Sequence, residues 1–159
     1  MKNSKFVLKA VVLVVIVAIL SVTLSACLKI GLKENNVISR LEAYGATVKK
    51  NMRSAPVIEG WTSNADVAVK NILYATYVPD VDSSAGLDGE DVDMSAYEMQ
   101  ELYVIYTDDK KSGDWVEEHC KAYVKAEENA DVTAHWNVYR YDNIILVGDY
   151  RLLAVARQY

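Results

Sequence analysis

Leu102-Tyr103-Val104-Ile105-Tyr106, within residues 98–107, is the run on which the predicted fold depends. β-branched and aromatic residues favour extended structure, so this run predicts a strand. Residues 66–78 are similarly β-rich, and apolar side chains alternate along them at Val67, Val69, Leu73, Ala75 and Tyr77. Ser63 and Asp66 could instead form a helix-capping box, but the density of Val, Ile, Tyr and Thr favours a strand. We expect the two strands to pair as a hairpin.

The segment after this hairpin predicts a helix. Ser112-Gly113-Asp114 opens it, and Asp114 with Glu117 can form a capping pair. An apolar stripe follows at Trp115, Val116, Cys120, Tyr123 and Val124. The opposite face is charged, and we expect the helix to end near Asn129.

A second hairpin and a last helix are predicted at the carboxyl end. Residues 136–141 and 144–147 can pair around Asp142-Asn143, because Asn and Asp tolerate positive φ. Asp149 can cap a final helix that contains Leu152 and Leu153, and a third short strand is the alternative.

The segment before the first hairpin predicts one helix and one strand. Asn36 can cap a helix whose apolar face is formed by Val37, Ile38, Leu41 and Tyr44. Gly45 suits the left-handed position after its end, and residues 46–52 then favour a strand. The whole order predicts an α+β fold with a mainly antiparallel sheet of about five strands. Because the strands alternate, we expect two or three helices packed on one face.

The start of the chain has the order of a secretory signal. Lys2, Lys5 and Lys9 precede an uncharged, apolar run over residues 10–28, which ends in Leu24-Ser25-Ala26-Cys27. These four residues resemble the lipobox of bacterial lipoproteins with a type II signal peptide, in which the cysteine thiol takes a diacylglyceryl group. The resemblance implies cleavage before Cys27 and a small lipoprotein similar to those of Gram-positive bacteria, but no activity. The expected parts are a signal (1–26), a tether (27–36) and one extracytoplasmic domain (37–159).

An uncleaved membrane anchor is the alternative for this start, because about 17 to 20 apolar residues can span a bilayer as a helix. Both alternatives leave the lysines in the cytoplasm and the domain outside. We therefore expect a protein on the outer face of the cytoplasmic membrane, either lipid-anchored through Cys27 or single-pass with its carboxyl terminus outside.

The charge of the mature part argues against nucleic acid as a partner. The whole chain has 17 Lys plus Arg and 22 Asp plus Glu, and the signal contains three of the lysines and no acid. The remaining 14 basic and 22 acidic residues give a net charge near −8. Such a charge repels phosphate backbones, and no basic cluster follows the apolar run. The anchor is therefore the only predicted membrane contact.

The candidate catalytic side chains form no motif. His119 and His135 are the only histidines, and Cys120 has no partner if Cys27 is a thioether. Adjacent helical residues point about 100° apart, so His119 and Cys120 cannot form a thiol–imidazole pair. Zinc-type spacing and phosphate-binding glycine loops are both missing, so the sequence predicts no catalytic set and no cofactor.

Residues 79–96 predict a long solvated loop with many acids and few aliphatic residues. Its carboxylates, including Asp80, Asp82, Asp88 and Asp91, are the best candidates for a calcium site. The EF-hand pattern fails, because Ala85 stands where glycine is needed and Asp91 replaces the bidentate glutamate. We favour a mobile loop without a specific metal site.

The chain contains 11 Tyr and 3 Trp against a single Phe. Exposed rings could stack on sugars or a peptide, although rings at strand and stripe positions more often pack a core. The sequence therefore predicts a membrane-tethered binding or interaction module, with a protein or glycan partner that it does not identify. An envelope hydrolase and a calcium-dependent surface module are the alternatives. A deep pocket with His119 or His135 beside a carboxylate would favour the hydrolase.

Overall fold

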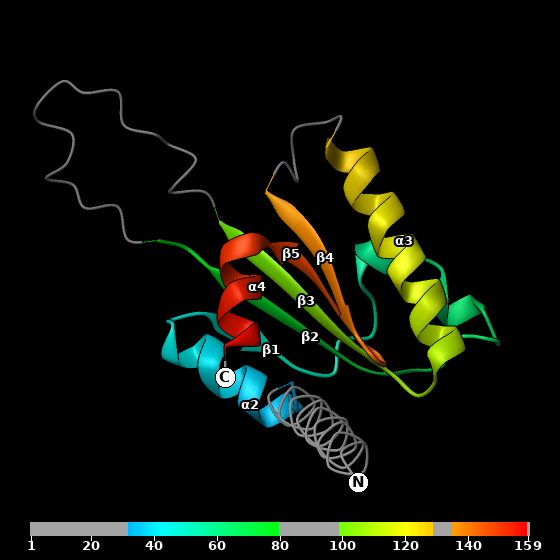
Figure 1. The fold of residues 1–159 in the computed structure, drawn as a ribbon, viewed down its shortest axis with the longest axis horizontal. Helices are drawn as coiled ribbons and strands as arrows, with labels where there is room; N and C mark the ends of the chain where they lie inside the picture. The colour runs from blue at the N-terminus through cyan, green and yellow to red at the C-terminus, as the bar shows by residue number, and fades with distance from the viewer. Residues whose placement is uncertain (1–31, 80–98, 129–134, 159) are drawn as a thin grey trace, which may run out of the picture.

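The computed structural model describes residues 32–79, 99–128 and 135–158. Within these residues, three helices flank one five-stranded sheet (Figure 1). The helices are α2 (Glu34–Ala43), α3 (Lys110–Glu128) and α4 (Tyr150–Arg157). The strands are β1 (Thr47–Lys49), β2 (Val69–Tyr77), β3 (Gln100–Thr107), β4 (Trp136–Tyr141) and β5 (Ile144–Asp149). The predicted α+β class and the predicted order of these elements are confirmed.

The sheet is antiparallel throughout and has the order β1-β2-β3-β5-β4. β2 and β3 pair over most of their lengths, with Tyr74 opposite Tyr103, which confirms the first predicted hairpin. β4 and β5 form the second predicted hairpin, in which Asp142 has a φ of +54°. The first hairpin follows from its two β-rich runs, and the second also from its turn residues, Asp142 and Asn143.

Helices cover both faces of the sheet, so the prediction of one covered face is wrong. On one face, α2 and α4 share a core with Leu73, Leu102 and Leu146. On the other, α3 packs over Ile72, Ile105 and Ile145 (Figure 1). The central strands are apolar at consecutive positions, and such strands require cover on both sides. Each fully buried Leu or Ile contributes about 1.5–3 kcal/mol, which is the reason both faces hold helices.

The termini of two helices differ from the prediction. α2 begins at Glu34 after Lys33, and Asn36 lies inside it, so the helix starts within the predicted tether. Leu32, before the helix, is fully buried. α3 begins at Lys110, and the Asp109 carboxylate accepts a hydrogen bond from the Ser112 N–H at 2.8 Å. Asp109 therefore takes the capping role predicted for Asp114, because it lies three residues before that N–H.

α4 begins where the sequence predicts it. Asp149 is its N-cap, and its carboxylate accepts from the Arg151 N–H at 2.7 Å. The alternative of a third short strand is therefore wrong. Gly45, just after α2, has a φ of +99°, as expected for the residue that ends that helix.

Several predictions concern residues outside the described ones. These are the signal and Cys27, and most of loop 79–96, including Asp80, Asp82, Asp88 and Asp91. Across residues 32–79, 99–128 and 135–158, no helix is both long and apolar enough to cross a membrane.

Candidate functional site

The candidate site is built on the segment between β1 and β2. Two short 3-10 helices, η1 (Pro56–Ile58) and η2 (Trp61–Ser63), are separated by Gly60, whose φ is +81°. Val57 and Ile58 are buried in the same core cluster as Val116 of α3. This packing holds the exposed residues around Gly60 beside the amino-terminal half of α3.

An open hollow with a volume of about 600 Å³ lies between this segment and α3. Its lining combines carboxylates, a hydroxyl, an amide and two rings: Glu59, Gly60, Ser63, Asn64, Ala65, Asp66, Trp115 and His119. The volume falls within the range of small-molecule sites. Because the hollow is shallow and open, water reaches its polar groups.

Trp115 and His119 form the aromatic wall of the hollow. They lie one turn apart on α3, and their rings stack with centroids 3.6 Å apart and an interplanar angle of 22°. The His119 Nδ1 is 2.9 Å from the Trp115 carbonyl oxygen. A carbonyl oxygen only accepts, so Nδ1 donates, and Nε2 of the neutral ring is an acceptor. The stacking and this hydrogen bond fix both the ring plane and the tautomer.

The polar groups of the hollow are largely available to a ligand. Glu59 and Ser63 are exposed, and their side chains form no hydrogen bond or ion pair within the described residues. Asp66 pairs with Lys111 at 3.4 Å, where both side chains are more than 70% exposed (77% and 74%). An ion pair this exposed contributes only about 0–1 kcal/mol. A ligand can therefore displace it at little cost.

A second, smaller hollow of about 270 Å³ adjoins the first. The two share Glu59 and Gly60, and the second is also lined by Trp61 and Ser54. The Trp61 ring is half-buried against the core under α3. Its indole N–H is buried and has no acceptor in the described part of the chain. Such unpaired buried donors are rare in folded proteins.

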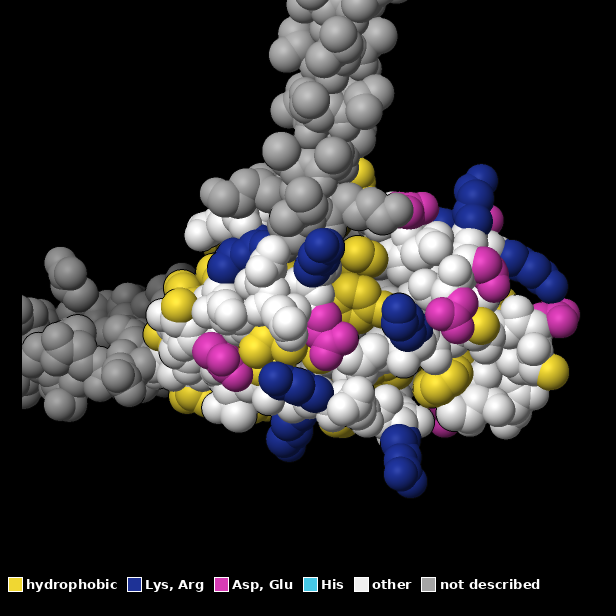
Figure 2. Space-filling view, turned by 90° about the horizontal axis from the view of Figure 1, so that it is seen from below, with side chains coloured by type: hydrophobic (Ala, Val, Ile, Leu, Met, Phe, Trp, Pro, Cys, Tyr) yellow, Lys and Arg dark blue, Asp and Glu magenta, His cyan; other side chains and the backbone are white. Residues whose placement is uncertain are grey.

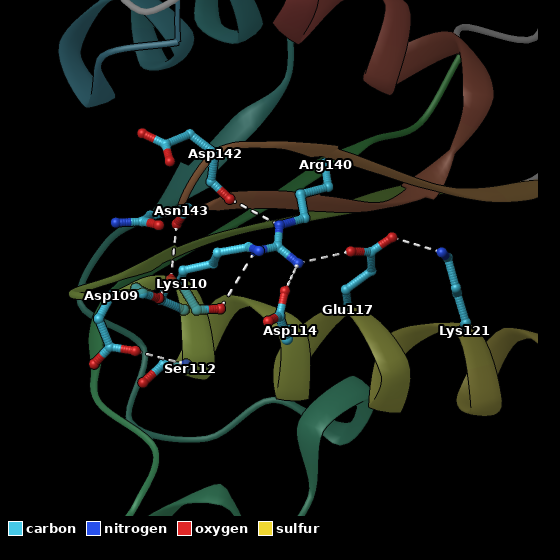
Figure 3. A network of polar contacts seen from close by, with 10 residues as sticks. Asp109, Lys110, Ser112, Asp114, Glu117, Lys121, Arg140, Asp142 and Asn143 are labelled. Carbon is cyan, nitrogen blue, oxygen red and sulfur yellow. Dashed lines mark hydrogen bonds and ion pairs between the residues drawn. The ribbon is translucent and has the colours of Figure 1, made fainter.

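A network of ion pairs fixes α3 to the sheet (Figure 3). Arg140 of β4 donates to Asp114 at 2.6 Å and to Glu117 at 2.9 Å, and Lys121 donates to Glu117 at 2.5 Å. These bonds from Lys121 and Arg140 hold the pKa of Glu117 below its ordinary value. The predicted capping pair, Asp114 and Glu117, thus serves as the acceptor set for Arg140. The network holds the helix that presents Trp115 and His119.

The structure separates the predicted candidates for chemistry. His119 lines the hollow with Glu59 and Asp66, whereas His135 is exposed before β4, with its ring 6.4 Å from that of Tyr150. Cys120 is fully buried, and this burial raises the pKa of its thiol to about 12. His119 and Cys120 therefore point into different environments, as predicted. Sequence reasoning missed Glu59 and Trp61, because the only local signal in this segment is Ser54-Ala55-Pro56, which predicts a break after the strand at residues 46–52 and no site.

The hollow offers hydrogen-bonding groups, but among the described residues they form no catalytic triad or dyad and no metal site. Nucleophilic catalysis requires a hydrogen bond between the nucleophile and its base. Ser63 and His119 both line the hollow, but no hydrogen bond joins them among the described residues. Nor do three His, Cys, Asp or Glu residues of the described ranges lie close enough together to hold a metal ion. The available chemistry is hydrogen bonding beside a flat aromatic surface.

Most other rings pack the sheet. Tyr74 and Tyr103 stack with centroids 4.7 Å apart, and Trp136 lies 6.2 Å from Tyr103 and from Tyr123. Tyr103 is only 7% exposed, and burial is the main reason that its pKa is raised to about 12. On the face in Figure 2, Lys and Arg alternate with Asp and Glu, and hydrophobic areas lie between them. That face carries no continuous basic patch of the kind that nucleic acid requires.

The comparisons with known proteins give no relative. No family model matches the chain, and no curated protein or solved structure is significantly similar to it. The function must therefore be argued from the site itself.

Proposed function

We propose that this protein is a membrane-tethered, extracytoplasmic binding module whose ligand occupies the hollow beside Trp115. One observation carries the proposal: a fixed aromatic pair stands next to polar side chains that have no partner within the described residues. Binding sites combine apolar or aromatic contact with a few polar groups that orient the ligand. The stacked pair supplies the contact area, and Glu59, Ser63 and His119 Nε2 supply the orienting groups.

The membrane tether is proposed from the sequence, through the lipobox that ends at Cys27. The described domain supports a close attachment, because Leu32 is already part of the core below α2. Only five residue steps separate Cys27 from Leu32, and they can span at most about 18 Å. The domain would therefore bind its ligand close to the membrane surface.

Capture from the native envelope tests the binding function. The full chain, solubilised in a polyoxyethylene detergent, serves as bait, and Trp115→Ala and Glu59→Gln are compared with it. Trp115→Ala should lose most of the captured material, and Glu59→Gln should lose part of it, because Gln keeps an acceptor oxygen but not the charge. Tyr150→Ala, an exposed ring (49%) that does not line either hollow, is the matched control and should capture as the wild type does. Equal capture by all four proteins would contradict the proposed site.

A hydrolase is the second candidate, because His119 lines the same hollow as two carboxylates, those of Glu59 and Asp66. His119→Gln separates the two functions, since Gln can still hydrogen-bond but cannot transfer a proton as a base. Captured material that is cleaved by the wild type and not by His119→Gln would favour the hydrolase. Unchanged material in both cases supports a binding module.

A further inference from the structure

We propose that the ligand is an oligosaccharide that spans both hollows, with one sugar ring against Trp115 and another against Trp61. This inference rests on the proposed function, since it names the ligand of the same site. It assigns a second binding position, which the geometry of the first hollow alone does not require.

The two hollows repeat the same pair of features. Each is lined by one half-buried tryptophan, Trp115 in the first and Trp61 in the second, and Glu59 borders both. Two neighbouring hollows that each have one tryptophan and that share Glu59 suit a ligand made of repeating sugar rings. A single small molecule would not require the second tryptophan.

The groups in the hollows match the chemistry of sugars. The C–H face of a sugar ring packs against an aromatic ring, and its hydroxyls both donate and accept hydrogen bonds. Glu59 accepts from hydroxyls, Ser63 can do both, and His119 Nε2 accepts when neutral. Open, solvated sites of this kind suit hydroxyl-rich ligands, because water-mediated hydrogen bonds add to the direct ones.

A peptide fits the same surface less well. Peptides are recognised mainly by addition to a strand edge or by insertion of an apolar helix face into an apolar groove. The walls here are α3 and two 3-10 turns, so no strand edge of the described part of the chain borders the hollows. The first hollow is lined mainly by polar side chains.

The charge of the site further narrows the class of sugar. Lys111 is paired with Asp66, whereas the Glu59 carboxylate between the hollows has no cation beside it in the described residues. Uncharged and amino sugars should therefore bind better than uronic acids, because like charges repel.

Titration with defined oligomers tests this proposal. The full chain is kept in polyoxyethylene detergent, because maltoside and glucoside detergents carry sugar head groups. The probes are β-1,4-linked oligomers of glucose, of N-acetylglucosamine and of glucosamine with one, two, four and six rings, and oligogalacturonate of equal lengths. Calorimetry measures strong binding, and saturation-transfer NMR detects weak binding. At least one neutral or amino series should bind about tenfold more tightly with four rings than with one.

The variants separate the two positions. Trp61→Ala should reduce the affinity for four rings nearly to the affinity for one ring, and Trp115→Ala should weaken binding at every length. Glu59→Gln should reduce the discrimination against oligogalacturonate, and Tyr150→Ala should behave as the wild type. Circular dichroism and the melting temperature identify any variant that fails to fold. In that case Trp61→Phe and Trp115→Phe, which keep a ring, replace the alanine variants. They should show the same pattern with smaller losses of affinity.

The outcomes also separate this inference from the proposed function. If no oligomer binds while envelope capture still depends on Trp115, the ligand is not an oligosaccharide, and the binding function stands. Length dependence that persists in both Trp61 variants would overturn the second position. If neither oligomer binding nor capture depends on Trp115, both proposals are wrong.

Discussion

Gly148 in β5 lies where the backbone of β3 comes closest. Its φ is +150°, and a Cβ there would lie 2.2 Å from the Glu101 carbonyl oxygen and 2.7 Å from the Leu102 Cα. Both atoms belong to backbone that cannot rotate away as a side chain can. Gly148→Ala should therefore destabilise the fold by about 3 kcal/mol or more, measured as the free energy of unfolding in urea.

Gly60→Ala is the control for this prediction. Gly60 also has a positive φ, +81°, but no atom lies within 4 Å of a Cβ built there. Its replacement should cost only the conformational penalty of about 1–2 kcal/mol. Equal losses for the two variants would mean that close contact between β3 and β5 is not what requires Gly148.

Burial lowers the reactivity of the Cys120 thiol. The side chain is fully buried, and burial raises the pKa of the thiol to about 12. Thiolates are the reactive form, so a water-soluble thiol reagent should label Cys120 slowly in the native protein and rapidly in urea. The full chain with Cys27→Ala leaves Cys120 as its only cysteine for this measurement. Fast native labelling would contradict the core position.

Turn residues and the cap of α4 were predictable, whereas the caps predicted at Asn36 and Asp114 were not found. Gly45, Asp142 and Asp149 adopt the roles that their own backbone preferences indicate. Glu59 and Trp61 acquire their roles only because η1 packs onto α3, a contact between segments more than 50 positions apart. No local spacing encodes that contact, so the site could not be predicted from the sequence.

Among the elements, α3 depends on charge as well as on packing. Hydrogen bonds from Lys121 and Arg140 hold the pKa of Glu117 below its ordinary value of 4.5. A carboxyl whose pKa is lowered by folding stabilises the fold above that ordinary value and loses this contribution as the pH falls through the folded pKa. Glu117→Gln should therefore lower stability by about 1 kcal/mol at pH 7 and by less as the pH falls below 4.5.

Glu118→Gln is the matched control, because Glu118 is exposed on the same helix and forms no hydrogen bond or ion pair in the described residues. Melting temperatures of the three proteins between pH 7 and pH 3 provide the measurement. Other carboxyls with a lowered pKa, such as Asp109, act equally in all three and cancel in the differences. A difference in melting temperature between wild type and Glu117→Gln that does not change with pH would contradict this role of Glu117.

The elements themselves were largely predictable, but their layering was not. Alternation in 66–78 and the turn at Asp142 were enough to predict both hairpins. The consecutive apolar positions of β3, from Leu102 to Ile105, were interpreted only as strand propensity. They also indicate that both faces are buried, and this second meaning places α3 opposite α2 and α4.

At the scale of the whole molecule, the proposed attachment places a small acidic domain directly on the membrane. With Leu32 in the core and at most about 18 Å of chain back to Cys27, a domain attached in this way would have little freedom to move away from the surface. Two acyl chains make such attachment durable, whereas one chain gives only marginal binding. A ligand of the hollows would then have to be present at the envelope itself.

Cys27→Ala should abolish both lipid labelling and signal cleavage. The acyl transfer needs the thiol, and the lipoprotein peptidase acts on the modified cysteine, so the variant should keep its apolar segment of residues 10–28. Mass spectrometry of the amino terminus, together with labelling by a palmitate analogue, compares the variant with the wild type, in which a modified Cys27 should be the first residue. An unlabelled wild-type chain that begins at Met1 would instead establish the uncleaved anchor. In that case a helix of about 17 to 20 apolar residues, and not a lipid, would hold the domain at the outer face.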